Sequence, residues 1–143
     1  MLFRHAICFL LAFLLGCAGS STEDLDDAGH VAVVCTTGMV VDLAQRIGGD
    51  RVRVIGLMGP GVDPHYYKAS QGDLAKLERA DLILYNGLSL EGKMQDIFGK
   101  MARIKRIVAV ADAVDKAELL QPDGLEGHYD PHIWFDVSLW SNT

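Results

Sequence analysis

The sequence predicts an α/β fold in which a parallel sheet is flanked by helices. Segments with strand and helix character alternate along the chain, and each strand segment is a continuous apolar run. Continuous apolar runs are typical of strands that are buried on both faces. Strands and helices that alternate in this way form a parallel sheet with helices on both sides.

The first two predicted strands lie on either side of a short helix. A valine-rich run predicts a strand at Val31–Cys35, and apolar residues at helical spacing predict a helix over Met39–Ile47. Two glycines follow that helix and would end it. The second strand is expected over Val52–Met58, before the sequence Gly59-Pro60-Gly61, which cannot continue a strand.

The second half of the chain repeats this alternation. A helix is expected from Ser70, which forms a capping-box pattern with an aspartate three residues later, to Ala80. A short apolar strand at Leu82–Tyr85, a helix over Ser89–Met101 and a strand at Ile107–Val110 follow. Ligands bind such sheets at the loops beyond the carboxyl ends of the strands, so functional residues are expected there.

The N-terminus has the features of a secretory signal. Residues 1–16 carry Arg4 near their start, then an apolar run from Ala6 to Leu15 that is too short to span a bilayer, with small residues after it. Leu14, Gly16 and Cys17 resemble a bacterial lipobox, which implies cleavage before Cys17 and its lipidation. An ordinary signal peptide with an incidental cysteine is the alternative. We expect an extracytoplasmic protein that is lipid-anchored to the membrane, in the periplasm or at the cell surface.

The composition of the rest of the chain limits its domain organisation, its partners and its disulfide content. Residues 17–29 are polar and acidic and are expected to form a tether, and residues 30–143 are expected to form one folded unit. The formal net charge of −6 argues against a nucleic-acid partner, which would favour a basic surface. Cys35 is the one cysteine beyond the N-terminal segment, so no disulfide framework is expected.

The tripeptide Asp-Pro-His occurs twice, ending at His65 and at His132. Imidazole is the commonest protein metal ligand, and a preceding proline stiffens the backbone that orients it. We predict that His65 and His132 are metal ligands, for Zn²⁺ or a similar first-row ion, and that Asp63 and Asp130 support them from the outer shell. The alternative is that each Asp-Pro only initiates a turn.

Other candidate sites are weaker. His128 lies four residues before His132, but the proline between them makes a continuous helix there unfavourable, so His128 is not expected to be a ligand. The glycine-rich segment from Gly56 to Gly61 fits neither a dinucleotide fingerprint nor a P-loop. The sequence has no His-Glu-x-x-His helix, and no general base can be placed beside a metal, so catalysis is not expected.

Three segments carry a resemblance to a known family: residues 56–67, 80–91 and 130–136. They resemble the two ligand loops, and a strand and turn between them, of the cluster A-I substrate-binding proteins of bacterial ABC importers for zinc, manganese and iron. The resemblance is nearest to the TroA-like branch of this zinc-uptake solute-binding family. It extends over the chain from Val31 onward.

The resemblance implies a two-lobed, periplasmic-binding-protein-like metal receptor that delivers a divalent ion (Zn, Mn or Fe) to an ABC permease. His65 and His132 match the two ligands of the N-terminal lobe, and the other lobe would supply two more. The chain ends about where the family's connecting helix begins, so we expect a fragment without the C-terminal lobe. A closed structural zinc site normally has four ligands, so we expect this chain to bind metal weakly.

The resemblance leaves the metal and two other functions open. The zinc-specific branch often has a histidine-rich loop, whereas residues 121–129 contain only His128, which favours manganese, iron or mixed specificity. Members of the family have been described as adhesins, so a surface adhesin is the first alternative function. A lipid-anchored metalloenzyme is the second and less favoured alternative.

Overall fold

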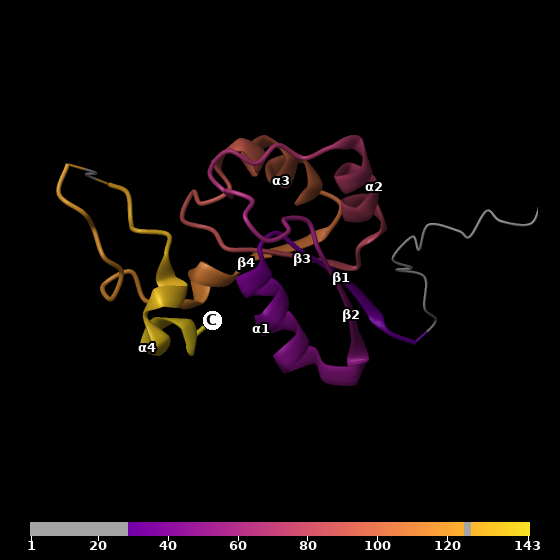
Figure 1. Cartoon of the computed structure of the whole chain (residues 1–143), viewed down its shortest axis with the longest axis horizontal. Coiled ribbons are helices and arrows are strands. Elements are labelled where there is room, and N and C mark those ends of the chain that lie inside the picture. The colour runs from indigo at the N-terminus through magenta and orange to yellow at the C-terminus, as the bar shows by residue number, and fades with distance from the viewer. Residues whose placement is uncertain (1–28, 125–126) are drawn as a thin grey trace, which may run out of the picture.

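The computed structural model describes residues 29–124 and 127–143. Within them, four strands form one sheet in the order β2-β1-β3-β4, and every neighbouring pair is parallel (Figure 1). The strands are β1 (Val31–Cys35), β2 (Val52–Gly56), β3 (Leu82–Tyr85) and β4 (Arg106–Ala109). The predicted α/β fold with a parallel sheet is therefore confirmed.

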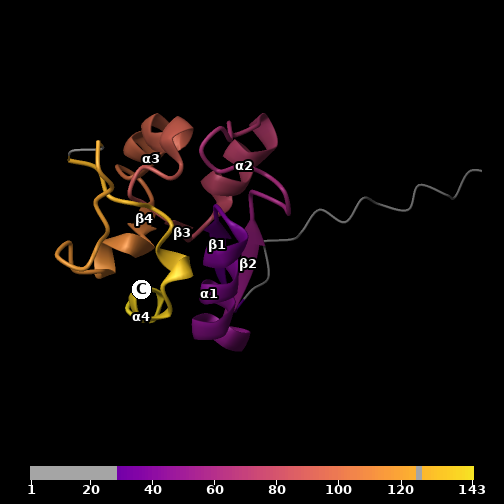
Figure 2. The ribbon, with the colours of Figure 1, turned by 60° about the vertical axis from the view of Figure 1, so that its left-hand side comes forward.

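Helices cover both faces of the sheet, as the continuous apolar runs predicted. Figures 1 and 2 show α2 and α3 on one side of the sheet and α1 on the other. Ala32 and Val34 of β1 pack on the α2 and α3 side, whereas Val33 and Cys35 pack on the α1 side. The helices are α1 (Gly38–Gly48), α2 (Gln71–Arg79), α3 (Gln95–Met101) and α4 (Val137–Trp140), and short 3-10 turns lie at Gly49–Arg51, Gly92–Met94, Val110–Ala113 and Ile133–Phe135.

Two predicted element boundaries are wrong by more than one residue. The helix expected from Ser89 begins only at Gln95, because Leu88 and Ser89 have φ values of 51° and 64°, outside the helical region. The second strand ends at Gly56 rather than Met58. Leu57 and Met58 lie in the loop that follows, although their N–H groups still donate to the carbonyls of Cys35 and Thr36 at the end of β1.

The order of the strands sets the position of the functional loops. The chain moves outward from β1 to β2 and then returns to the opposite side of β1 to form β3. Such a reversal leaves a crevice at the carboxyl ends of the two central strands, where ligands bind in open α/β sheets. Thr36 follows β1 at this edge and Asn86 follows β3.

The α1 side of the sheet is covered unevenly. Helix α1 packs against β1 and β2, and an apolar groove of about 510 Å³ lies beside it over β3 and β4. Leu82, Leu84 and Val108 from the strands and Ile47 from α1 are among its lining residues.

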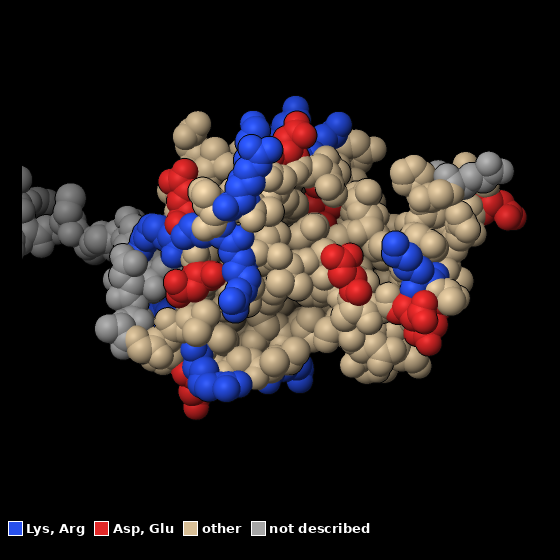
Figure 3. Space-filling model, turned by 180° about the vertical axis from the view of Figure 1, so that it is seen from behind, with Lys and Arg blue, Asp and Glu red and all other residues tan. Residues whose placement is uncertain are grey.

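On the face shown in Figure 3, Lys and Arg side chains are interspersed with Asp and Glu side chains, so this face has no large surface of one charge.

The predicted signal peptide (residues 1–16), Cys17 and all but the last residue of the predicted tether (17–29) lie outside the described residues. Their roles stay predictions. In the part of the chain that the structure describes, no helix is both long and apolar enough to cross a membrane.

Candidate metal centre

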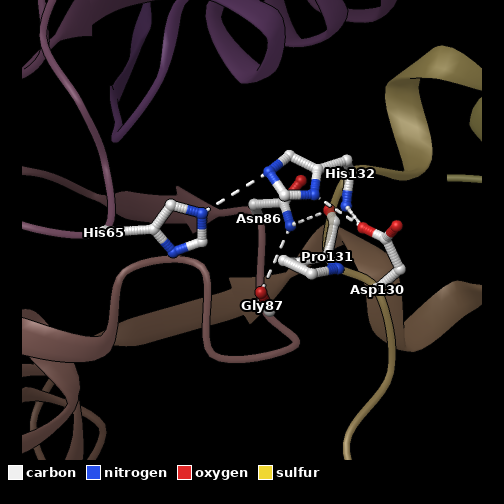
Figure 4. Close-up of polar contacts among 6 residues, drawn as sticks. All are labelled: His65, Asn86, Gly87, Asp130, Pro131 and His132. Carbon is white, nitrogen blue, oxygen red and sulfur yellow. Dashed lines mark hydrogen bonds and ion pairs between the residues drawn. The ribbon is translucent and has the colours of Figure 1, made fainter. Parts of the chain in front are cut away.

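The structure brings the two Asp-Pro-His histidines together. His65 lies in the loop that follows β2, and His132 lies just before the 3-10 turn Ile133–Phe135. Their Nε2 atoms are 3.4 Å apart, and their rings lie edge to face with centroids 5.5 Å apart (Figure 4). His65 is exposed, and the His132 side chain is 39% exposed. The pair therefore faces solvent on one side.

The separation of the two Nε2 atoms suits a shared metal ion. Two nitrogens that bind Zn²⁺ at about 2.0–2.1 Å with a tetrahedral angle between them are about 3.3–3.4 Å apart. The observed 3.4 Å matches this value. The spacing is therefore compatible with one shared ion, as it is with an Nε2–H···Nε2 hydrogen bond between the two rings.

Asp130 fixes the tautomer of His132. Its Oδ1 accepts hydrogen bonds from the His132 backbone N–H at 2.9 Å and from the ring Nδ1–H at 2.6 Å. The bond from the backbone N–H, with help from the ring, holds the pKa of Asp130 below its usual value. Because Nδ1 carries the proton, the lone pair lies on Nε2, which is the atom that faces His65.

Asp63 has a different contact. Its Oδ1 accepts from the His65 backbone N–H at 2.9 Å, which tightens the turn of the loop. The contact therefore orients the backbone rather than the imidazole. The two aspartates, which occupy the same place in the repeated tripeptide, do not act in the same way on their histidines.

Among the described residues, no third side chain joins the pair. Across residues 29–124 and 127–143, no group of three His, Cys, Asp or Glu side chains is arranged to hold a metal ion. His128 is exposed in the loop that precedes Asp130. The ligand role of His65 and His132 stays a prediction, which their geometry supports.

The first histidine loop is anchored to the start of α2. The hydroxyl of Tyr67 donates to Asp73 Oδ2 at 2.7 Å and to the Leu57 carbonyl at 3.3 Å. The same Oδ2 accepts from the backbone N–H and the hydroxyl of Ser70, which completes the predicted capping box. Burial, followed by the bond to Asp73, raises the pKa of Tyr67 to about 12. Tyr67 lies two residues after His65, so these bonds limit the movement of that loop.

Replacing Asp73 by Asn is expected to lower the free energy of unfolding by about 1–2 kcal/mol at pH 7. Burial raises the pKa of Asp73, but hydrogen bonds from Ser70 and Tyr67 outweigh it, so the folded-state pKa is below normal. Stability from such a group is present above its unfolded pKa, near 4, and is lost as pH falls through the lower folded value. The difference between wild type and D73N should therefore shrink below about pH 4 in urea titrations. D123N, in an exposed loop, is the control, and a difference that is unchanged at pH 3 would contradict the expectation.

The second histidine loop is anchored by residues that the sequence patterns did not single out. Asn86 Nδ2 donates to the Pro131 carbonyl at 2.9 Å, and the backbone N–H of Asn86 donates to Glu91 Oε1 at 2.8 Å. Glu91 also accepts from the Thr36 hydroxyl at 2.7 Å. These side chains are fully buried. A polar residue directly after an apolar strand, here Asn86 after β3, is the signal that could have indicated them.

Several known proteins are similar to this chain over most of its length. The profile of the family described as zinc-uptake complex component A, periplasmic, matches residues 33–143. The manganese-binding lipoprotein MntA of Bacillus subtilis is 47% identical over 135 residues, which are 94% of this chain and 44% of that protein. The iron ABC transporter substrate-binding lipoprotein MtsA of Streptococcus pyogenes is 31% identical, over 90% of this chain and 43% of its own.

A solved structure shows the same fold. The periplasmic zinc-binding protein TroA of Treponema pallidum superposes with a TM-score of 0.75 and 47% identity, over 80% of this chain and 40% of that chain. The chain thus spans less than half the length of the relatives it matches. These relatives are named for metal binding and transport rather than for catalysis. The chain belongs to the zinc-uptake complex component A family of periplasmic proteins.

Proposed function

We propose that this chain captures a divalent transition-metal ion outside the cytoplasm for delivery to an ABC permease. The observation that carries the proposal is the 3.4 Å separation of the Nε2 atoms of His65 and His132. The relatives that are named for zinc, manganese and iron support the class of ion without selecting one. This role requires no bond to be made or broken in a substrate, so the proposal includes no enzymatic activity.

The residues of this chain act by orientation. Asp130 keeps the proton on His132 Nδ1, and the histidine of the other loop faces the same point in space. Neutral imidazole nitrogens suit first-row ions of the zinc type better than Ca²⁺ or Mg²⁺, which prefer oxygen ligands. The cargo is therefore a transition metal, and further ligands would raise the affinity of this two-nitrogen site.

The proposal includes a membrane anchor at Cys17. Lipidation there would leave the residues before His30 as a polar tether between the membrane and the folded part. The lipoprotein names of MntA and MtsA support this placement. An extracytoplasmic anchor of this kind would keep the captured ion close to the permease.

Metal uptake in living cells tests the proposal. In a strain whose gene carries both H65A and H132A, uptake of radioactive zinc, manganese or iron through this system is expected to fall to the level of a gene deletion. H128A is the matched control, because it removes an exposed histidine from the loop before Asp130. It should leave uptake unchanged.

The same strains separate transport from adhesion. If the main function were adhesion to a host surface, H65A with H132A would leave metal uptake intact. Uptake that persists in the double variant, with the variant protein present at the wild-type level, would show that the transport assignment is wrong.

A further inference from the structure

Asn86 ties the second histidine loop to the sheet. Its side chain is fully buried after β3, and Nδ2 donates to the carbonyls of Pro131 at 2.9 Å and Gly87 at 3.2 Å (Figure 4). Pro131 is 45 residues away in the sequence and directly precedes His132. This one side chain therefore connects the carboxyl end of a central strand with the backbone next to a candidate ligand.

The backbone of Asn86 is anchored on both sides. Its N–H donates to Glu91 Oε1 at 2.8 Å, and its carbonyl accepts from the Ala111 N–H at 3.0 Å, just after β4. Glu91 Oε1 also accepts from the Thr36 hydroxyl, which follows β1. Asn86 cannot shift without moving the carboxyl ends of three strands, so its side chain is a fixed reference point for the loop.

The turn after Asn86 is held in an unfavourable backbone conformation. Gly87, Leu88 and Ser89 have φ values of 91°, 51° and 64°. A side chain at Gly87 would place its Cβ 2.9 Å from the Cβ of Ala109. Non-glycine residues adopt positive φ at a cost, and such conformations persist where surrounding contacts enforce them. The hydrogen bonds that the backbone N–H groups of Asn86 and Gly87 donate to the Glu91 carboxylate are such contacts.

The hydrogen bonds of the Asn86 side chain indicate why a carboxamide occupies this position. Its Oδ1 is buried and has no hydrogen-bond partner in the described residues. An unpaired buried acceptor is unfavourable, and leucine would occupy nearly the same space without one. The position therefore uses the two N–H donors of the carboxamide, which bind two carbonyls, rather than its volume.

We propose that Asn86 is a positioning residue for metal capture, which holds His132 at the correct distance from His65 through the Pro131 carbonyl. This inference rests on the proposed function. Residues that orient a ligand from outside the coordination shell typically change metal affinity 10–100-fold when they are replaced. The hydrogen bonds of the Asn86 side chain go to the Gly87 and Pro131 carbonyls and not to an imidazole, so it acts through the backbone of the second loop.

Metal binding by Asn86 variants tests the inference. N86A and N86L are expected to weaken Zn²⁺ binding by about tenfold or more in titration calorimetry. They should also change the ligand-field absorption of bound Co²⁺, which reports the arrangement of the ligands. N86L fills the space of the side chain, so it provides the result if N86A does not fold.

M101A is the matched control. Met101 is buried at the end of α3, before β4 and so at the opposite edge of the sheet from the histidine loops. Its truncation lowers stability through a core cavity and should leave the Zn²⁺ affinity and the Co²⁺ spectrum unchanged. A change in M101A equal to that in N86L would mean that stability alone explains the effect, and the inference would be wrong.

The outcomes separate this inference from the proposed function. If H132A removes Zn²⁺ binding while both Asn86 variants bind with wild-type affinity and an unchanged Co²⁺ spectrum, the positioning role is wrong and metal capture stands. If H132A binds Zn²⁺ as well as wild type does, the site is not metal-binding, and both conclusions are overturned.

Discussion

H132A is expected to lose Zn²⁺ binding to a greater extent than any outer-shell variant, by more than about 100-fold. The chain brings two imidazoles together at this site, and a single nitrogen does not chelate. H65A should cause an equal loss, because each histidine contributes one nitrogen to the same ion. Calorimetric titration of the three proteins with Zn²⁺ at pH 7 measures the effect.

Two further variants in the loop of His132 test whether the loss of Zn²⁺ affinity is specific to the histidine pair. H128A should bind as wild type does, since His128 is exposed and lies outside the pair. D130N should bind about tenfold more weakly, because it weakens the interaction that fixes the His132 tautomer. An affinity for H132A within a factor of two of wild type would rule out the site.

E91A is expected to lower the free energy of unfolding by roughly 3 kcal/mol or more. The Glu91 carboxyl is fully buried and accepts hydrogen bonds from Thr36 Oγ1, Asn86 N and Gly87 N. Its removal leaves three buried donors without a partner, and each unpaired buried donor costs about 1–3 kcal/mol. Domains of this size are stable by only about 5–15 kcal/mol, so the loss is a large fraction of the total. Urea denaturation followed by circular dichroism measures it.

A comparison of E91A with E91Q separates the effect of the lost hydrogen bonds from the effect of the lost side-chain volume. E91Q keeps one acceptor oxygen, so its loss should be smaller than that of E91A. E78A, at an exposed glutamate of α2, should change stability by less than about 0.5 kcal/mol. An E91A protein as stable as E78A would show that the three hydrogen bonds contribute nothing to stability.

The strands were predictable because their composition reflects burial on two faces. Val31–Cys35 and Leu82–Tyr85 were predicted with the observed bounds, since apolar runs of that length have few alternatives. The start of α3 was not predictable. Leu90 continues the helical spacing of Met94 and Phe98. The close approach of the Gly87 backbone to Ala109 and the hydrogen bond from the Gly87 N–H to Glu91 enforce a turn instead. Those contacts join segments that only the folded sheet brings together.

Part of the candidate site could be predicted from the sequence, and part could not. The repeated tripeptide was enough to predict that His65 and His132 form a pair. The unequal roles of Asp63 and Asp130 could not be predicted, because identical tripeptides placed their carboxylates differently relative to the imidazoles. The support from Asn86 also depends on strand order, since it requires the end of β3 to lie beside Pro131.

The distance between the two histidines along the chain has a thermodynamic consequence. His65 and His132 are separated by 67 residues, so an ion bound to both joins two segments that are independent in the unfolded chain. A ligand that binds only the folded state stabilises it by mass action, by about 2.7 kcal/mol at a free concentration 100 times its Kd. The bound ion would then also be part of what keeps the chain folded. Release of the ion would leave a molecule that unfolds more readily, so metal-starved cells would hold it in its most protease-sensitive form.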